Sequence, residues 1–276
     1  MHTFRRQMMK IFTRLTGLNI THKGRGWELF GLETLSRFLS EFHVDCVFDV
    51  GANSGQYATR LRKAGFRGLI ISFEPNPTVF ANLQIAAKAD AQWITKQIAL
   101  DSEPRILMFN VMKLDSFSSL HEPDHSETGT FVNKNVVERQ VPVSTETLDA
   151  LFPGLQEKFH FSRPFLKMDT QGHDLDVVAG ARKCLSNFIG LQSELSLTKL
   201  YKGAPAFSEA LALYQSRGFK LTGLIPSNAA HFPDLHEIDC IMYNSQLRER
   251  TILAARANNN EGAAVSASNP AAMALL

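Results

Sequence analysis

The chain has 276 residues, of which 44% are hydrophobic and 20% are charged, and its formal net charge at pH 7 is +2. This length and apolar content suffice for one α/β domain with a buried core. Apolar runs stay well short of the roughly 18 residues of a membrane-spanning helix, and charges interrupt the apolar residues at the start of the chain. We therefore expect neither a transmembrane segment nor a cleavable secretory signal.

The cysteines, Cys46, Cys184 and Cys240, lie far apart in the sequence and have apolar neighbours. The sequence contains no Cys-x-x-Cys pair and no cluster of Cys and His, which argues against a disulfide framework and against a zinc site. We expect buried thiols in a reducing, cytoplasmic environment.

The first part of the chain, residues 1–26, is basic and lacks acidic residues. Its apolar residues recur on one helical face, which predicts an amphipathic helix. Two interpretations stay open: a helix that binds the anionic inner face of a membrane, or a helix that packs on the domain with a solvated basic side. Basic and aromatic residues do not continue to alternate beyond this segment, so no nucleic-acid partner is expected.

The pattern of elements divides the chain into three parts. Residues 1–44 hold the basic helix and a second helix over 27–42, and residues 45–250 form the main domain. The tail, residues 251–276, is rich in Ala, Asn and Ser without amphipathic periodicity, which predicts disorder.

Within the domain, apolar strands and helices first alternate, as is typical of a doubly wound parallel sheet. Ser54 and Gly65 are the expected caps of the first of these helices. An insertion over about 104–145 interrupts the alternation, and its polar stretch, 122–135, is predicted to be a mobile loop over a pocket. The expected strands are 46–50, 69–73, 93–100, 106–111, 139–145, 165–168 and 189–193, with a terminal antiparallel hairpin of 220–225 and 238–243. The expected helices of the domain are 54–64, 77–87, 174–185 and 206–218.

The most informative segment is the glycine turn after the first strand. The strand ends at Asp49 and Val50, and the turn contains Gly51 and Gly55, which let the backbone approach a ligand. The next strand ends in Glu74, which can accept hydrogen bonds from both hydroxyls of a ribose. This combination predicts a site for a nucleoside cofactor.

Three cofactor classes share such a site. A Walker-type phosphate loop needs Gly-Lys-Ser/Thr at the helix start, which is absent. A dinucleotide site needs G-x-G-x-x-G and a helix N-terminus free for pyrophosphate. Here the glycines are spaced Gly51-x-x-x-Gly55, and Asp49 would repel pyrophosphate but attract a cationic methionine tail. The pattern favours S-adenosylmethionine over an ordinary strand–turn–helix corner without a ligand.

A second acid and glycine turn follows the strand 165–168. Ligands of open parallel sheets bind beyond the carboxyl ends of the strands, so Asp169 should face the same crevice as Asp49 and Glu74, and Glu194 would be a fourth acid there. His173 suits the role of a base that removes a hydroxyl proton, although it could instead satisfy the start of its helix.

The role of Asp169 stays open among three alternatives. It could be the base, contact the methionine amine, or bind a metal ion. Glu194 could share that ion with it, because Mg²⁺ prefers carboxylate oxygens. Glu194 could equally be a structural acid.

Together these motifs resemble those of the FkbM family of S-adenosylmethionine-dependent methyltransferases. The matching segments, in order over about residues 45–245, are Phe48-Asp-Val-Gly-Ala-Asn-Ser-Gly-Gln56, Phe73-Glu-Pro-Asn-Pro77, Ser118-Ser-Leu120, Leu166-Lys-Met-Asp-Thr-Gln-Gly-His-Asp174 and Ala179-Gly-Ala181. The resemblance implies a class I methyltransferase (Rossmann-like) fold, with a mostly parallel seven-stranded sheet, helices on both faces and an antiparallel terminal hairpin. It also implies methyl transfer to a hydroxyl, commonly of a sugar or a natural product, so the acceptor would be a small molecule or a glycan such as a glycolipid or polysaccharide.

The resemblance also implies roles for individual residues. The methionine side of the cofactor would contact Asp49, Gly51, Asn53 and Gly55, the ribose would be held by Glu74 in the segment that includes Asn76, and the adenine would lie near Gln97 and Ile98. The chain departs from the family pattern at Thr170, where Val is usual, and at Asp174, where Glu is usual.

Other functions stay open. The chain could bind the cofactor without catalysis, transfer methyl to nitrogen, or be a nicotinamide-dependent oxidoreductase. The absence of G-x-G-x-x-G argues against the oxidoreductase. The absence of an Asn/Asp-Pro-Pro-Tyr type of motif argues for oxygen over nitrogen.

Overall fold

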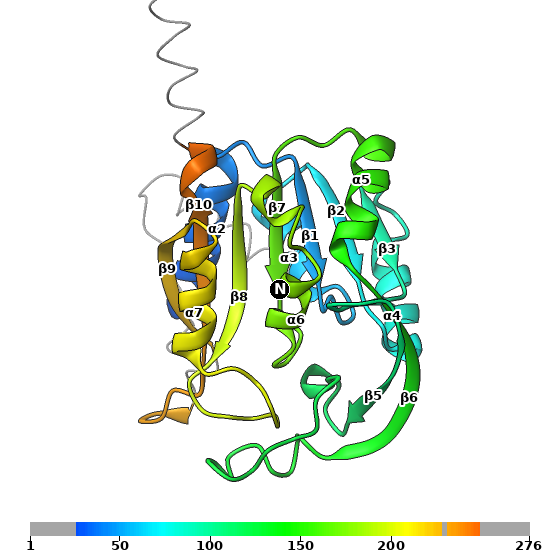
Figure 1. Cartoon of the computed structure of the whole chain (residues 1–276), viewed down its shortest axis with the longest axis vertical. Coiled ribbons are helices and arrows are strands. Elements are labelled where there is room, and N and C mark those ends of the chain that lie inside the picture. Colours follow the sequence, from blue (N-terminus) through cyan, green and yellow to red (C-terminus); the bar gives the residue numbers. More distant parts are fainter. Residues whose placement is uncertain (1–25, 228–230, 249–276) are drawn as a thin grey trace, which may run out of the picture.

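The structure, a computed structural model, describes residues 26–227 and 231–248 (Figure 1). The predicted basic helix before residue 26 and the predicted disordered tail therefore lie outside the described residues. Among the helices that are described, none combines the length and the apolar character needed to cross a bilayer.

The core of the fold is a seven-stranded sheet. Its order is β3 (Trp93–Lys96), β2 (Leu69–Phe73), β1 (Cys46–Val50), β7 (Pro164–Met168), β8 (Gly190–Ser196), β10 (Glu237–Asn244) and β9 (Phe219–Ser227). The strands from β3 to β8 are parallel, whereas β10 is antiparallel to both of its neighbours. The predicted mostly parallel sheet with a terminal hairpin is confirmed. Strand order reverses between β1 and β7, where open α/β sheets bind their ligands.

Helices cover both faces of this sheet because its central strands are buried on both sides. In β1, Val47 packs into a cluster with α2 (Gly26–Glu41), α3 (Gln56–Ala64) and α4 (Pro77–Ala87). The next residue, Phe48, packs on the opposite face with α5 (Leu148–Phe159), α6 (Asp174–Ala179) and α7 (Phe207–Ser216). Successive side chains of a strand point to opposite faces, so a strand with apolar residues on both sides requires cover on each. The predicted buried thiols are confirmed, since Cys46, Cys184 and Cys240 are free and buried.

A second, three-stranded sheet is formed by β4 (Ala99–Leu100), β6 (Val137–Glu146) and β5 (Ile106–Met112). β6 runs parallel to β4 and antiparallel to β5. The strand predicted over 93–100 is therefore two strands, because the chain leaves the main sheet after Lys96. In Figure 1 β5 and β6 lie beyond the carboxyl ends of the main strands, which places the insertion next to the expected ligand site.

The polar stretch 122–135 of the insertion is tied to the loop after β8. The backbone nitrogen of Asp124 and the side-chain amide of Asn135 both donate to the carbonyl of Leu200, at 2.8 and 3.0 Å. The nitrogen of Lys202 donates to the carbonyl of Glu122. The structure thus gives this stretch a defined docking place, and its mobility stays a prediction.

The helix boundaries differ from the predictions at several places. α3 begins after Gly55 without a side-chain cap, so Ser54 as its cap is wrong, whereas Gly65 ends this helix as expected. α6 ends at Ala179, and a short 3₁₀ helix (Leu185–Asn187) replaces the end of the predicted helix 174–185. α5 was not predicted, because Pro153 inside it interrupts the helical pattern; Thr147 caps it by accepting from the nitrogen of Ala150.

Candidate active site

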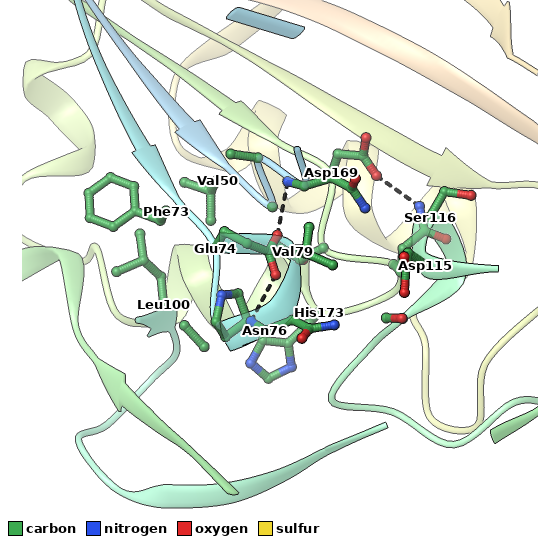
Figure 2. Close-up of a pocket in the computed structure, with 18 of the residues that line it drawn as sticks. Val50, Phe73, Glu74, Asn76, Val79, Leu100, Asp115, Ser116, Asp169 and His173 are labelled. Carbon is green, nitrogen blue, oxygen red and sulfur yellow. Dashed lines mark hydrogen bonds between the residues drawn. The ribbon is translucent and has the colours of Figure 1, made fainter. Parts of the chain in front are cut away.

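A cavity of about 380 Å³ lies at the carboxyl ends of β1, β2, β4 and β7. The predicted residues on its wall are Gly51, Asn53, Glu74, Asn76, Ile98, Asp169 and His173 (Figure 2). Four other predicted residues do not line it: Asp49, Gly55, Gln97 and Glu194. The strand ends thus converge on one crevice, as expected, but some of the predicted residues lie behind its wall.

Glu74 follows the last residue of β2 and holds the turn after β1. One carboxylate oxygen accepts from the backbone nitrogen of Asn53 and the other from that of Asn76, each at 2.9 Å (dashed in Figure 2). Burial raises the pKa of Glu74 to about 7, although both backbone hydrogen bonds and Lys167 oppose the shift. Each oxygen keeps a lone pair, so the carboxylate can also accept from two vicinal hydroxyls, the arrangement that a ribose presents.

Asn76 adds a second polar group at this end of the cavity. Its side-chain oxygen caps α4 by accepting from the nitrogen of Thr78, whereas its Nδ2 is buried without a hydrogen-bond partner among the described residues. A buried donor without a partner is costly unless a ligand satisfies it. Apolar side chains surround this end of the cavity: Phe73, Val79, Ile98, Leu100 and Phe109. Together they fit the ribose and the flat base of a nucleoside.

The two glycines of the turn serve different purposes. Gly51 has a φ of +73°, and a Cβ there would lie 2.0 Å from the backbone oxygen of Asp169, so the turns after β1 and β7 pack too closely for a side chain. Gly55 has a φ of +86°, and a Cβ there would lie 2.7 Å from the ring of Trp93. Gly51 therefore shapes the cavity wall, whereas Gly55 allows the turn to pack on the sheet.

Asp49 is fully buried beneath the cavity and is paired with Lys167. The Lys167 ammonium lies 3.2 Å from Asp49 and 3.6 Å from Asp169, and it donates to the carbonyl of Gly51 at 3.2 Å. Burial alone would lower the pKa of Lys167, but the carboxylates of Asp49 and Asp169 outweigh it and raise the pKa above its usual value. Asp49 thus holds Lys167 in place, and Lys167 in turn holds the carbonyl of Gly51.

Asp169 and Glu194 are bridged by the side-chain amide of Gln171. Its Nε2 donates to Asp169 at 2.8 Å and to Glu194 at 2.7 Å, while its oxygen accepts from the hydroxyl of Tyr201 at 2.7 Å. Burial, together with neighbouring carboxylates, raises the pKa of Glu194 well above its usual value. The amide of Gln171 therefore lies between Asp169 and Glu194, the two acids predicted to share Mg²⁺. That metal site stays a prediction.

Asp174, one of the departures from the family pattern, has a structural role. It accepts from the backbone nitrogen and hydroxyl of Thr170 and, at 2.6 Å, from the hydroxyl of Ser193. The shorter side chain at 174 is thus matched by the hydroxyl at 170, which Val could not supply. This pair fixes the turn that carries Asp169.

His173 lines the cavity, but both of its ring nitrogens face other side chains. Nε2 lies 3.3 Å from Asp101, and Nδ1 lies 3.1 Å from Nε2 of His121 and 3.2 Å from Asp176. Burial lowers the pKa of His173, and His121 adds to this effect while Asp176 and Asp101 oppose it. The side chain of Asp169 is 38% exposed and that of His173 only 6%. Both predicted bases line the cavity, and Asp169 is the more exposed of the two.

The opposite end of the cavity is polar. The 3₁₀ helix η1 (Asp115–Phe117) of the insertion supplies Asp115 and Ser116, and Ser118 follows them on the wall (Figure 2). The hydroxyl of Ser119 donates to the carbonyl of Gln171 at 2.7 Å, which holds the insertion against the turn after β7. The side chains at this end can accept hydrogen bonds from a hydroxylated acceptor and can donate hydrogen bonds to it.

Sequence reasoning missed Lys167, Gln171, His121, Asp176 and Asp101. A charged Lys within the apolar strand 164–168 was an available signal, because an unpaired ammonium is not buried in a sheet. The other contacts join segments whose proximity depends on the second sheet and on the loop after β8, and no local pattern indicates them.

The sheet order, the terminal hairpin and the cavity at the strand ends together are those of the class I methyltransferase fold. Residues 49–221, more than half of the chain, match the sequence profile of the methyltransferase FkbM domain. The chain therefore belongs to the FkbM methyltransferase family, and it is a methyltransferase.

Solved structures with a similar fold are distant from this chain. Fibrillarin of Aeropyrum pernix, solved with natively bound S-adenosyl-L-methionine, is 11% identical over 72% of this chain and 66% of its own, with a TM-score of 0.38. Magnesium protoporphyrin IX methyltransferase of Synechocystis, solved with bound SAM, is 11% identical over 85% and 89%, with a TM-score of 0.41. A putative S-adenosylmethionine-dependent methyltransferase of Listeria monocytogenes is 7% identical over 79% and 98%, with a TM-score of 0.44. A search of curated protein sequences gave no match.

Proposed function

We propose that this protein transfers the methyl group of S-adenosylmethionine to a hydroxyl oxygen of a sugar or another polyhydroxylated acceptor. The observation that carries the proposal is the division of the cavity. One end combines the doubly anchored Glu74 with apolar walls, and the other is lined by Asp115, Ser116, Ser118 and Asp169.

The apolar end accounts for the nucleoside half of the cofactor. Glu74 would accept the ribose hydroxyls, Asn76 would donate from its buried Nδ2, and the adenine would lie against the apolar side chains beside Ile98. The methionine half would follow the turn at Gly51 and Asn53 toward Asp169. S-adenosylmethionine then supplies an activated methyl group on a sulfonium.

The residues at the polar end would position and deprotonate the acceptor. In this transfer the acceptor oxygen would bond to the methyl carbon as the carbon–sulfur bond breaks, the sulfur would leave as a neutral thioether, and the hydroxyl proton would pass to the carboxylate of Asp169. Because the displacement is in line, much of the rate acceleration would come from holding oxygen, carbon and sulfur collinear. The hydrogen bond from Gln171 fixes the carboxylate for this role.

The side chains at the polar end of the cavity also indicate the class of acceptor. Hydroxyl and carboxyl side chains from the insertion suit an acceptor with several hydroxyls, such as a sugar in a natural product, polysaccharide or glycolipid. A glycolipid acceptor at the inner face of a membrane would be favoured if residues 1–26 bind lipid, and of these only Gly26 belongs to the described residues.

The test is methyl transfer to defined acceptors. The full chain is incubated with S-adenosylmethionine labelled in the methyl group and with sugars, nucleotide-linked sugars and their amino analogues. We expect label on a hydroxyl, and none with the Glu74→Ala variant. Label on amines alone would assign nitrogen as the acceptor atom. Tight cofactor binding without transfer to any acceptor would support a catalytically silent protein.

A further inference from the structure

Three metal-ligating side chains converge at the edge of the cavity. Nε2 of His121, Nδ1 of His173 and Oδ2 of Asp176 all lie within 4.8 Å of one another. His121 comes from the insertion, whereas His173 and Asp176 come from the start of α6, so the cluster joins two separate segments of the chain. His173 itself belongs to the cavity wall (Figure 2).

The contacts around the two rings bring nitrogen atoms face to face. Nδ1 of His121 faces the carbonyl of Lys202 at 3.1 Å, so this nitrogen carries the proton of a neutral ring and Nε2 presents a lone pair. Nε2 of His173 lies 3.3 Å from Asp101 but is buried without a hydrogen-bond partner among the described residues. A proton on that nitrogen, next to the carboxylate, leaves Nδ1 of His173 with a lone pair that faces Nε2 of His121 at 3.1 Å. In this arrangement, a metal ion between the rings would accept both lone pairs.

The carboxylate of Asp176 makes a metal ion the better solution. Its Oδ2 is a third lone-pair donor, 3.2 Å from Nδ1 of His173 and 3.9 Å from Nε2 of His121. Two ligands of a tetrahedral zinc ion, at about 2.0–2.1 Å from the metal, lie roughly 3.3 Å apart. A single proton can join only two of these three atoms, whereas a divalent ion can bind all of them.

The groups behind the histidines have the arrangement typical of metal sites. Ligating histidines usually donate their other N–H to a carboxylate or a backbone carbonyl, which fixes the ring. The carbonyl of Lys202 takes this role for His121. For His173 the nearest such group is the carboxylate of Asp101, 3.3 Å from Nε2, and Asp101 is itself held by Arg105 at 2.8 Å and by the backbone nitrogen of Ser102. The ring of His121 is therefore oriented before any ion binds, and a carboxylate lies beside the ring of His173.

We propose that His121, His173 and Asp176 bind a divalent transition-metal ion at the edge of the cofactor cavity. Two imidazoles and one carboxylate favour an ion such as Zn²⁺, Co²⁺ or Mn²⁺ over Mg²⁺, which prefers oxygen ligands. Only three protein ligands are present among the described residues, so at least one coordination position is open. Given the proposed function, this position would take an oxygen of the acceptor. The site is distinct from the predicted pair of Asp169 and Glu194.

The test uses Co²⁺, because its visible absorption reports nitrogen and oxygen ligands directly. The untagged full chain is treated with a chelator, dialysed and titrated with Co²⁺, and the bound ion is then displaced with Zn²⁺. We expect a Co²⁺ absorption band that saturates at one equivalent and is lost in His121→Ala. Asp176→Asn should weaken Co²⁺ binding at least about tenfold. The control His125→Ala removes an exposed histidine of the same loop and should bind Co²⁺ like the wild type.

Chemical unfolding of each variant shows whether it is folded before the titration is interpreted. His121 and Asp176 are partly exposed, so both substitutions should leave the domain folded. Absence of the band in the folded wild type, or equal Co²⁺ binding by wild type and His121→Ala, would overturn the proposal and leave a shared proton between the rings. Neither result depends on cofactor binding or methyl transfer, so failure here is distinguishable from failure of the proposed function.

Discussion

Asp49 and Lys167 lie directly opposite each other in the register of β1 and β7, and their side chains form an ion pair of 3.2 Å beneath the cofactor cavity. Both side chains are almost completely buried. The pair joins the two strands at the point where strand order reverses. Because Lys167 also contacts Asp169 and the carbonyl of Gly51, it connects the two turns that carry the cavity wall.

Breaking this pair should destabilise the fold. Lys167→Met leaves the buried charge of Asp49 with only the hydroxyl of Ser72 as a partner, at 3.0 Å. Loss of one partner of a buried ion pair costs about 3–5 kcal/mol, and we expect a decrease of this size in the free energy of unfolding. Urea denaturation measures it, with the exposed Lys63→Met as the control.

The double variant Asp49→Asn/Lys167→Met tests whether the unpaired charge of Asp49 causes this loss of stability. Removing both charges should recover part of the lost stability, because no unpaired charge then remains buried. If Lys167→Met is as stable as Lys63→Met, the ion pair does not hold the strand ends together.

Much of the main sheet could be predicted because its strands are continuous apolar runs bounded by acids and glycines. The bounds of β1, β2 and α4 agree with the prediction to the residue. The sequence did not predict α5, because Pro153 interrupts its helical pattern. β4 was predicted as part of one strand with β3, because its two residues follow β3 closely although they join a different sheet.

The candidate site was predictable only where a local pattern marks a residue. Glu74 and Asp169 follow apolar strands directly, so their convergence followed from the parallel sheet. Asp49 instead lies inside β1, one residue before its end, and its side chain does not line the cavity. Its partner, Lys167, depends on the register between β1 and β7. The contact between His121 and His173 joins residues 52 positions apart through the insertion, which sequence periodicity does not describe.

The affinity for the cofactor should depend on pH through Glu74. Burial raises its pKa to about 7, so roughly nine tenths of the carboxyl groups are ionised at pH 8 and about one tenth at pH 6. Only the ionised group can accept from the backbone and from both ribose hydroxyls. Affinity should therefore fall about tenfold as the pH decreases from 8 to 6.

The ligand for this measurement is 5′-methylthioadenosine, which keeps the ribose and lacks the titrating amino group of methionine. Calorimetric titration at pH 6, 7 and 8 gives the affinities, and Glu74→Gln should abolish their pH dependence. An equally strong pH dependence in Glu74→Gln would assign it to another group.

Alanine at position 51 should be poorly tolerated. A Cβ on Gly51 would lie 2.0 Å from a backbone oxygen, and the residue has a φ of +73°. Both effects should together cost more than about 3 kcal/mol of unfolding free energy. In contrast, Gly154→Ala in α5 meets no atom within 4 Å and should stabilise the protein by about 0.5–1 kcal/mol. Thermal unfolding of both variants measures the difference, and a Gly51→Ala protein as stable as wild type would contradict the close packing of the turns.

Asp169→Asn should separate catalysis from cofactor binding. Loss of a general base typically lowers a rate by about 10²–10⁴-fold, and we expect a decrease within this range in methyl transfer to the acceptor found by screening. The dissociation constant of S-adenosylmethionine should change by less than about threefold, because Asp169 would act on the acceptor. Single-turnover kinetics and calorimetry measure the two quantities, and a rate unchanged in Asp169→Asn would exclude it as the base.

We expect the cavity to bind S-adenosylmethionine through the carboxylate of Glu74. Calorimetric titration of the full chain with S-adenosylmethionine tests it most directly, alongside Glu74→Ala and the control Glu157→Ala, which removes an exposed acid of α5. We predict micromolar or tighter binding by the wild type and the control, and at least about a 100-fold loss in Glu74→Ala, because two charge-assisted hydrogen bonds disappear. A folded wild type that does not bind the cofactor would contradict its assignment to this cavity, and a Glu74→Ala variant that binds it as tightly would contradict the role of Glu74.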